Sequence, residues 1–285
     1  MTLPTTDTIV TYPAGDTTSE SRVIHVESLA SDGGGDRLAV LLDRTAVHPV
    51  DAGWPDQGAD RALLDAGDLE IPVLDAVVAA TDGERLYLGS EIPVRKGTDG
   101  WAFVVAHLVD ADASLTEGDT VTVEVDAGHR ELLSAGHSAC HLASLALDAA
   151  LAGAWSKDNR GFDATANETS TILERGSRDT YRVGKSVRKA GFDPAALDDA
   201  DAVAAQVNAT LASWVAAGGA IRIDRDGELL TDRRYWVASL PDGDVRLACG
   251  GTHVSSIAEL GAISVELTTE QLDGAVGLTM VTTAG

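Results

Sequence analysis

The chain has 285 residues, of which 45 are acidic and 21 are basic, and its formal net charge is −24. Such a surface repels nucleic acid unless positive charge is gathered locally. The absence of a long apolar run excludes a membrane-spanning helix, and residues 1–12 lack the pattern of a signal peptide. Two cysteines exclude a disulfide framework and suit a reducing compartment, so we expect a cytoplasmic protein with no membrane partner.

The first 128 residues contain short β-branched or alternating runs that predict strands. These runs are residues 8–12, 22–29, 37–43, 101–107 and 120–126. In the last run Val121, Val123 and Val125 face one side of the strand, and polar residues face the other. Turns are predicted at the Asp-Gly pairs 32–33, 82–83 and 99–100. Short strands with such turns favour a small barrel or sandwich.

The pattern changes after residue 126. Residues 131–151 are rich in Ala and Leu and contain no proline, which predicts a helix. A second helix is predicted over 194–217, with Asp193 as its N-cap and Gly218 near its end. Further strands are predicted at 220–224, 235–240 and 263–267. We expect an α+β fold with one domain over residues 1–128 and a second, metal-binding domain over residues 129–285.

Four residues have the identities and the spacing of a zinc site. His137 and His141 are four residues apart on the predicted helix, so both imidazoles lie on one face. Cys249 and His253 flank two glycines and a threonine, a composition that favours a tight turn over a helix. Three imidazoles and a thiolate favour Zn²⁺ over Mg²⁺ or Ca²⁺. Cys140 lies about one residue off the histidine face, and we interpret it as a buried apolar side chain.

The His-x-x-x-His helix followed by Cys-Gly-Gly-Thr-His-Val resembles the editing domain of alanyl-tRNA synthetase. It resembles still more the free-standing AlaX-type trans-editing proteins. Further matching stretches are residues 42–49, residues 118–123, Arg130 and residues 257–261. The resemblance covers residues 8–268. It implies a translation-factor-like β-barrel followed by an α+β zinc-binding editing domain.

The activity implied by the resemblance is a Zn²⁺-dependent hydrolysis of mischarged tRNA, with Ser- or Gly-tRNA for alanine as the expected substrates. His137, His141, Cys249 and His253 would bind the metal. Thr45 would contact a serine hydroxyl, although a strand threonine with a satisfied hydroxyl is the alternative. Gly250 and Gly251 would let the end of the tRNA approach. The early loop departs from the family, because Trp54 stands where a glutamine is usual, and this leaves the amino-acid selectivity open.

Six of the 21 basic residues fall within 15 residues of one another, a local excess that predicts contacts with a tRNA backbone. They are Arg175, Arg178, Arg182, Lys185, Arg188 and Lys189. The alternative is a solvated surface that makes ion pairs with nearby aspartates. Two other functions also stay open. One is a zinc hydrolase that acts on another aminoacyl-tRNA or a small acyl ester, and the other is a non-catalytic aminoacyl-tRNA binding module with a structural zinc.

Overall fold

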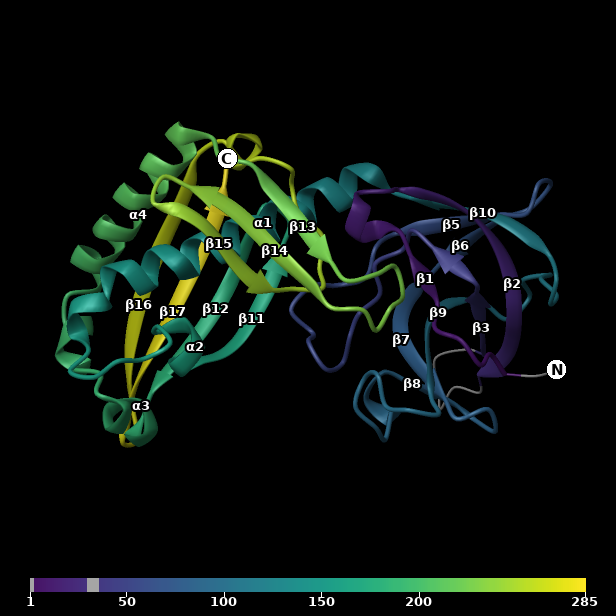
Figure 1. Ribbon diagram of the computed structural model, residues 1–285, viewed down its shortest axis with the longest axis horizontal. Helices are drawn as coiled ribbons and strands as arrows, with labels where there is room; N and C mark the ends of the chain where they lie inside the picture. The colour runs from purple at the N-terminus through teal and green to yellow at the C-terminus, as the bar shows by residue number, and fades with distance from the viewer. Residues whose placement is uncertain (1–2, 30–35) are drawn as a thin grey trace. The chain divides into compact units, whose positions relative to one another are not determined.

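The computed structural model describes residues 3–29 and 36–285 and has an α+β fold (Figure 1). The described chain forms two compact units. The first unit takes residues up to Arg130, then 223–236 and 247–252, and the second takes 131–222, 237–246 and 253–285. The assignment of residues 1–128 and 129–285 as separate functional domains stays a prediction. The predicted turn at residues 32–33 lies outside the described residues.

The chain up to residue 126 is built mainly from strands, as the sequence predicts. They are β1 (Ile9–Val10), β2 (Thr18–Leu29), β3 (Arg37–Leu42), β4 (Arg44–Thr45), β5 (Ala62–Asp65), β6 (Glu70–Val73), β7 (Asp75–Thr81), β8 (Leu86–Leu88), β9 (Ala102–Asp110) and β10 (Thr120–Val125). Short 3₁₀ helices occupy Tyr12–Ala14 and Gly89–Glu91. The strand predicted over 8–12 is therefore only two residues long, because Pro13 lacks the backbone N–H that would continue a ladder.

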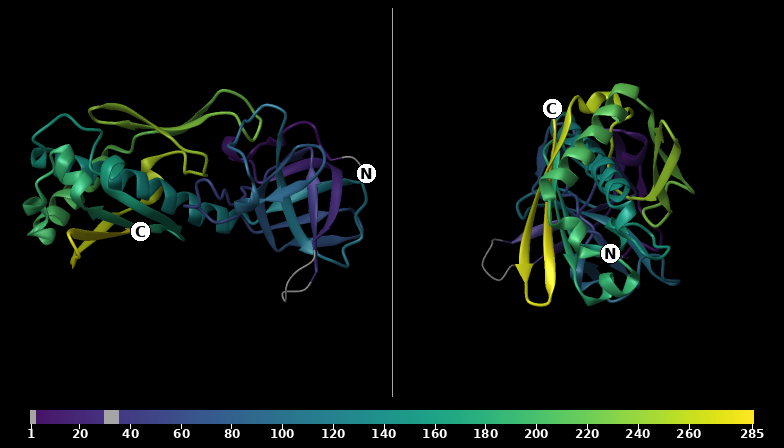
Figure 2. Two further views of the ribbon diagram at one scale, coloured as in Figure 1. Left: turned by 90° about the horizontal axis from the view of Figure 1, so that it is seen from below. Right: turned by 90° about the vertical axis from the view of Figure 1, so that its left-hand side faces the viewer.

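Eight of these strands form one antiparallel sheet of order β6-β5-β10-β2-β3-β9-β7-β8. Only Leu74 separates β6 from β7, so these two strands form one bent segment. Its β6 half pairs with β5 near one end of the sheet, and its β7 half pairs with β9 near the other end. Figure 2 shows the resulting strong curvature. The hydrogen-bonded order of the described strands still ends at β6 and β8, so the translation-factor-like barrel is not confirmed.

The concave side of this sheet encloses the core of the first unit. Val121, Val123 and Val125 are buried there, whereas Thr120 and Glu124 are exposed, which confirms the predicted alternation along this strand. Leu64 from β5 and Phe103 from β9 pack into the same core. A second buried cluster, which includes Leu41 and Val104, packs separately from this core, so the sheet is stabilised by apolar contacts in both clusters.

The remaining elements come from the rest of the chain. They are α1 (Ala127–Ala150), α2 (Asp163–Ala166), β11 (Asn167–Leu173), β12 (Gly176–Val183), α3 (Lys185–Ala190), α4 (Ala200–Ala217), β13 (Ile221–Arg225), β14 (Arg234–Leu240), β15 (Gly243–Ala248), β16 (Ile263–Leu272) and β17 (Ala275–Ala284). Short 3₁₀ helices occupy Ala152–Ala154, Pro194–Leu197 and Ile257–Leu260. Strands β11-β12-β17-β16 form an antiparallel sheet, and β13-β14-β15 form a second sheet. Figures 1 and 2 show α1 and α4 lying over the four-stranded sheet.

The helix predicted over 194–217 is divided in the structure. Asp193 caps the 3₁₀ helix Pro194–Leu197, and α4 begins only after Asp199, whose side chain accepts from the Ala202 N–H. A second aspartate that caps the backbone starts a new helix, and this is the reason for the break. Gly218 then ends α4 with a left-handed φ of 65°, as predicted. Among the described residues, no helix has the length and apolar character needed to cross a membrane.

Candidate metal centre

Helix α1 presents two histidines on one face. His137 is buried and His141 is half-buried, and their ring centroids are 4.8 Å apart. The helix packs closely on the β11–β12 hairpin at Gly136, where an added Cβ would lie 2.1 Å from the Leu173 carbonyl oxygen. Only glycine fits there, because those neighbours are backbone atoms. The local sequence therefore fixes the depth of the helix and with it the direction in which His137 points.

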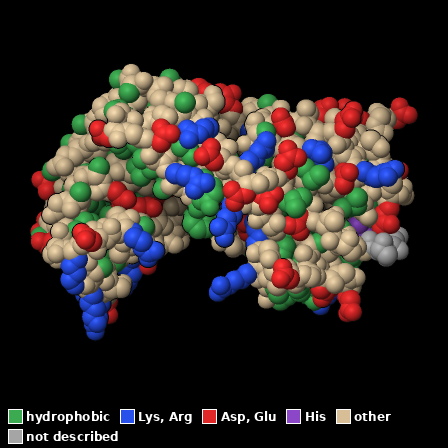
Figure 3. All heavy atoms as spheres, viewed as in Figure 1, with side chains coloured by type: hydrophobic (Ala, Val, Ile, Leu, Met, Phe, Trp, Pro, Cys, Tyr) green, Lys and Arg blue, Asp and Glu red, His purple; other side chains and the backbone are tan. Residues whose placement is uncertain are grey.

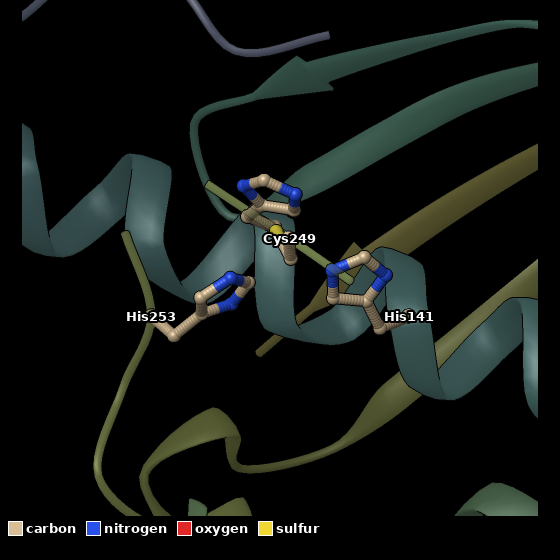
Figure 4. A group of neighbouring side chains, drawn as sticks. His141, Cys249 and His253 are labelled. Atoms are coloured by element: carbon tan, nitrogen blue, oxygen red, sulfur yellow. The ribbon is translucent and has the colours of Figure 1, made fainter. Parts of the chain in front are cut away.

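The segment after β15 brings the other two predicted ligands to the same place. The four side chains of His137, His141, Cys249 and His253 each offer a ligand atom, and these atoms all lie within 4.8 Å of one another. The His253 ring centroid is 4.4 Å from that of His137 and 5.2 Å from that of His141. In Figure 4 the side chains of His141, Cys249 and His253 point toward a common centre.

The chemistry of this donor set fits a zinc ion. Three imidazole nitrogens and one thiolate match the N/S ligands of zinc, and neither Mg²⁺ nor Ca²⁺ prefers such a set. The burial of Cys249, which is 6% exposed, removes it from bulk solvent. The cluster could hold a metal ion, as the spacing of the motifs predicted.

Ser138 sets the orientation of one candidate ligand. Its hydroxyl donates to the Ser134 carbonyl at 2.8 Å, so its oxygen accepts from neighbouring donors. One is the backbone N–H of Val254, at 3.2 Å, and the other is Nδ1 of His253, at 3.1 Å. The hydroxyl has one proton, which it donates to Ser134, so Nδ1 of His253 must be the donor in their shared bond. The imidazole hydrogen is therefore on Nδ1, and Nε2 of His253 is left to bind a metal.

Cys140 does not belong to the cluster, as interpreted from its position on the helix. Its thiol is buried and donates to Oδ1 of Asp179 at 3.4 Å. Burial, together with the nearby Asp179 carboxyl, raises the pKa of Cys140 well above its ordinary value. It stays a thiol on the side of α1 that faces the sheet, so Cys249 is the cysteine available for metal.

A cavity of about 410 Å³ lies in the first unit, and Cys249, Gly250 and Gly251 are among the residues that line it. Aromatic side chains, including Tyr12 and Trp54, form other parts of its wall. Gly250 is exposed, and a Cβ added there would meet no atom within 4 Å. The backbone beside the candidate thiolate is therefore open to an incoming group.

Thr45 was predicted as a substrate contact. It is fully buried, it does not line the cavity, and its hydroxyl is 2.8 Å from Nε2 of His107. The other ring nitrogen of His107, Nδ1, donates to the Val40 carbonyl, so Nε2 accepts from the Thr45 hydroxyl. The Thr45 oxygen accepts in turn from the Val47 N–H at 3.1 Å. The Thr45 hydroxyl is thus satisfied within the first unit, and its contact with a serine hydroxyl stays a prediction.

Comparison with known proteins adds a second kind of evidence. No family model matches the chain. The chain is 27% identical over 225 residues to the alanyl-tRNA editing protein AlaX-M of Pyrococcus horikoshii, which covers 79% of this chain and 78% of that protein. It is 29% identical over 284 residues to alanine–tRNA ligase of Halorubrum lacusprofundi and 26% identical over 290 residues to that of Halobacterium salinarum. These matches cover 95% and 97% of this chain but only 25% and 26% of the ligases.

The resemblance to AlaX-type editing proteins is confirmed. It extends over most of the chain, so the four candidate ligands belong to a longer similarity and not to an isolated motif. The loop that departs from the AlaX-type pattern lies at the cavity. Trp54 is 63% exposed there, and its indole N–H donates to Oδ2 of Asp56 at 2.9 Å.

The six predicted nucleic-acid contacts divide into two kinds. Arg175 is half-buried and donates to backbone carbonyls of Leu260, Ala284 and Gly285, so it holds the end of the chain. The other five are exposed, and Figure 3 shows basic side chains gathered where Figure 1 places α3. They are Arg178, Arg182, Lys185, Arg188 and Lys189. We call these five residues the basic surface of the second unit.

Sequence reasoning missed two polar residues near the candidate ligands. One is Ser138, which follows His137 directly, and the other is Gln57, which bonds to Thr252 in the segment between Cys249 and His253. A serine on a helix and a glutamine in a loop carry no spacing signal of their own. Only their three-dimensional contacts distinguish them from ordinary surface residues.

Proposed function

We propose that this protein is an aminoacyl-tRNA editing hydrolase that depends on zinc and clears mischarged tRNA. The observation that carries the proposal is the convergence of His137, His141, Cys249 and His253, whose ligand atoms lie within 4.8 Å of one another. The similarity to AlaX-M, which is named as an alanyl-tRNA editing protein, supports this function over other zinc hydrolases. We infer that it acts in the cytoplasm, where aminoacyl-tRNA is used.

The ester between an amino acid and the terminal ribose is the bond to be broken. Zinc in this site would polarise the ester carbonyl or lower the pKa of a bound water toward ~7. His137, His141 and Cys249 are the ligands that we assign as fixed. Four permanent protein ligands would close a zinc site to substrate, so we assign His253 as the fourth or movable ligand. Its movement would break the bond between its Nδ1 and the Ser138 hydroxyl.

The open cavity next to Cys249 supports entry of the aminoacylated end of tRNA. Its volume of about 410 Å³ is suited to a nucleoside or a small acyl group. Gly250 leaves the backbone uncovered at this point, so an RNA end would approach without meeting a side chain. We propose Gly250 and Gly251 as the residues that admit the substrate.

The basic surface supports binding of the tRNA backbone. Its members are exposed and lie on β12 and α3, two consecutive elements of the second unit. A local concentration of cations overcomes the repulsion expected from the net charge of −24, because charges more than about 10 Å away are screened at ordinary salt. Arg175 is left out of this proposal.

A second function is a non-catalytic module that binds aminoacyl-tRNA around a structural zinc. The complete set of four protein ligands favours it, since structural zinc sites are closed and tetrahedral. This alternative predicts tRNA affinity without release of the amino acid. A deacylation assay therefore separates the two functions.

The test is deacylation of a panel of charged tRNAs by the purified, zinc-loaded protein. We expect serine or glycine to be released from tRNA for alanine, and the correct alanine ester to survive. Release from a different aminoacyl-tRNA would keep the hydrolase and change its substrate. Binding of the whole panel without any release would support the non-catalytic module and contradict the editing activity.

A further inference from the structure

Gln57 makes two hydrogen bonds to one residue of the metal-binding segment. Its side-chain N–H donates to Oγ1 of Thr252 at 2.9 Å, and its side-chain oxygen accepts from the Thr252 backbone N–H at 3.0 Å. Both residues are buried, at 1% and 4% exposure. A buried side-chain amide that is paired on both its donor and acceptor sides fixes the position of its partner.

Thr252 lies in the segment that carries two of the candidate metal ligands, so its bonds to Gln57 bear on the metal site. Thr252 lies between Cys249 and His253, in a segment that follows β15 and belongs to neither a helix nor a strand. Its own backbone N–H has no ladder partner and bonds to a side chain instead. Where a segment lacks regular structure, side chains must satisfy the buried backbone groups and so determine its path.

Gln57 lies three residues before Asp60, in a loop that a buried ion pair anchors. At the base of the loop, Asp60 is buried and accepts from Nε of Arg130 at 2.6 Å and from the His48 N–H at 2.5 Å. Arg130 also donates to the Ala46 carbonyl at 2.8 Å. A buried, multiply bonded ion pair of this kind holds the loop in one conformation, so the Gln57 amide is presented from a fixed support.

We infer that Gln57 is a positioning residue for the metal site, because it fixes the turn that brings Cys249 and His253 to one ion. This inference rests on the metal site of the proposed function, but not on which substrate is hydrolysed. Partners that orient ligands contribute about 10- to 100-fold to metal affinity in proteins. Gln57 acts on the metal site through its two hydrogen bonds to Thr252.

The test measures zinc affinity without RNA, by competition with a chromophoric chelator, and records the visible spectrum of the Co²⁺-substituted protein. Gln57→Met keeps the shape of the side chain and removes both hydrogen bonds. We expect zinc to bind this variant about 10- to 100-fold more weakly and the cobalt bands to shift. Thr252→Val removes only the bond to the hydroxyl, so we expect a smaller loss of affinity.

The double variant and an exposed control complete the design. Gln57→Met with Thr252→Val should bind zinc about as weakly as Gln57→Met alone, because the two residues act through one interaction. Gln271→Met, on an exposed position of β16, should retain the wild-type affinity.

Wild-type zinc affinity in a folded Gln57→Met protein would overturn the inference, and so would additive losses in the double variant. If Gln57→Met does not fold, wild-type affinity in Thr252→Val would overturn it. Failure of the wild-type protein to bind zinc would contradict the metal site itself.

Discussion

At the scale of single residues, Thr45 lies on β4 and is fully buried. It bonds to His107, a histidine that is fully buried between strands. Burial lowers the pKa of His107 from 6.5 to about 4, and the bond to the Val40 carbonyl opposes this shift without cancelling it. The imidazole is therefore neutral at pH 7, as its bond to Thr45 requires.

This pKa shift predicts a pH dependence of stability. Between pH 6.5 and pH 4 the unfolded chain binds a proton at His107 and the folded protein does not, so stability is lost as the pH falls through this window. A shift of this size corresponds to about 3 kcal/mol. The free energy of unfolding of the metal-free protein and of metal-free His107→Gln would be measured by denaturant titration at pH 7 and at pH 4. We expect the loss between the two pH values to be larger in the wild-type protein, by about 3 kcal/mol. Parallel losses in the two proteins would contradict a neutral His107.

At the scale of the elements, α1 was predicted because its apolar composition and lack of proline are local properties. Strands β11 and β12 were not predicted, because their residues are largely polar and do not show an apolar run. Pairing orders them, since β12 lies between β11 and the distant strand β17. The break before α4 was missed for a related reason. Asp198 and Asp199 look like helix-surface residues until one of them is seen to cap the backbone.

The close packing of α1 on the β11–β12 hairpin gives a test at this scale. In Gly136→Ala the added methyl would approach backbone atoms of Leu173 and Gly176 to less than 3 Å, so the helix must shift. We expect a loss of at least about 1–3 kcal/mol of stability and weaker metal binding, since His137 is adjacent. Gly128→Ala on the same helix is the control, because its methyl meets only a side-chain atom at 3.5 Å. Equal stability of the two variants, measured by thermal unfolding, would contradict this packing.

For the whole molecule, the convergence of the four candidate ligands and the strand-rich character of the first 126 residues could be predicted from sequence. The positions of 223–236 and 247–252 within the first unit could not, because nothing local marks a segment that returns to an earlier unit. Net charge was also a poor guide. It describes the whole surface, whereas binding depends on where the cations gather.

The basic surface predicts how salt affects tRNA binding. Neutralising Arg182, Lys185 and Lys189 to glutamine should weaken tRNA binding and lower the slope of log affinity against log salt by roughly one for each phosphate contact that is lost. Filter binding at several salt concentrations measures both quantities. The matched control neutralises three exposed arginines elsewhere, Arg85, Arg95 and Arg225. Equal salt slopes in the two triple variants would contradict an RNA-binding role for this surface.

We propose the three histidines and Cys249 as the metal centre of an editing enzyme. The most direct measurement is the initial rate of serine release from Ser-tRNA for alanine by three samples, namely the zinc-loaded protein, the chelated protein and His137→Ala/His141→Ala. A catalytic metal lowers the activation barrier by several kcal/mol, so we expect the chelated sample and the variant to release serine at least about 100-fold more slowly. Added zinc should restore the rate of the chelated sample but not that of the variant. Serine release at the same rate in all three samples would contradict the account.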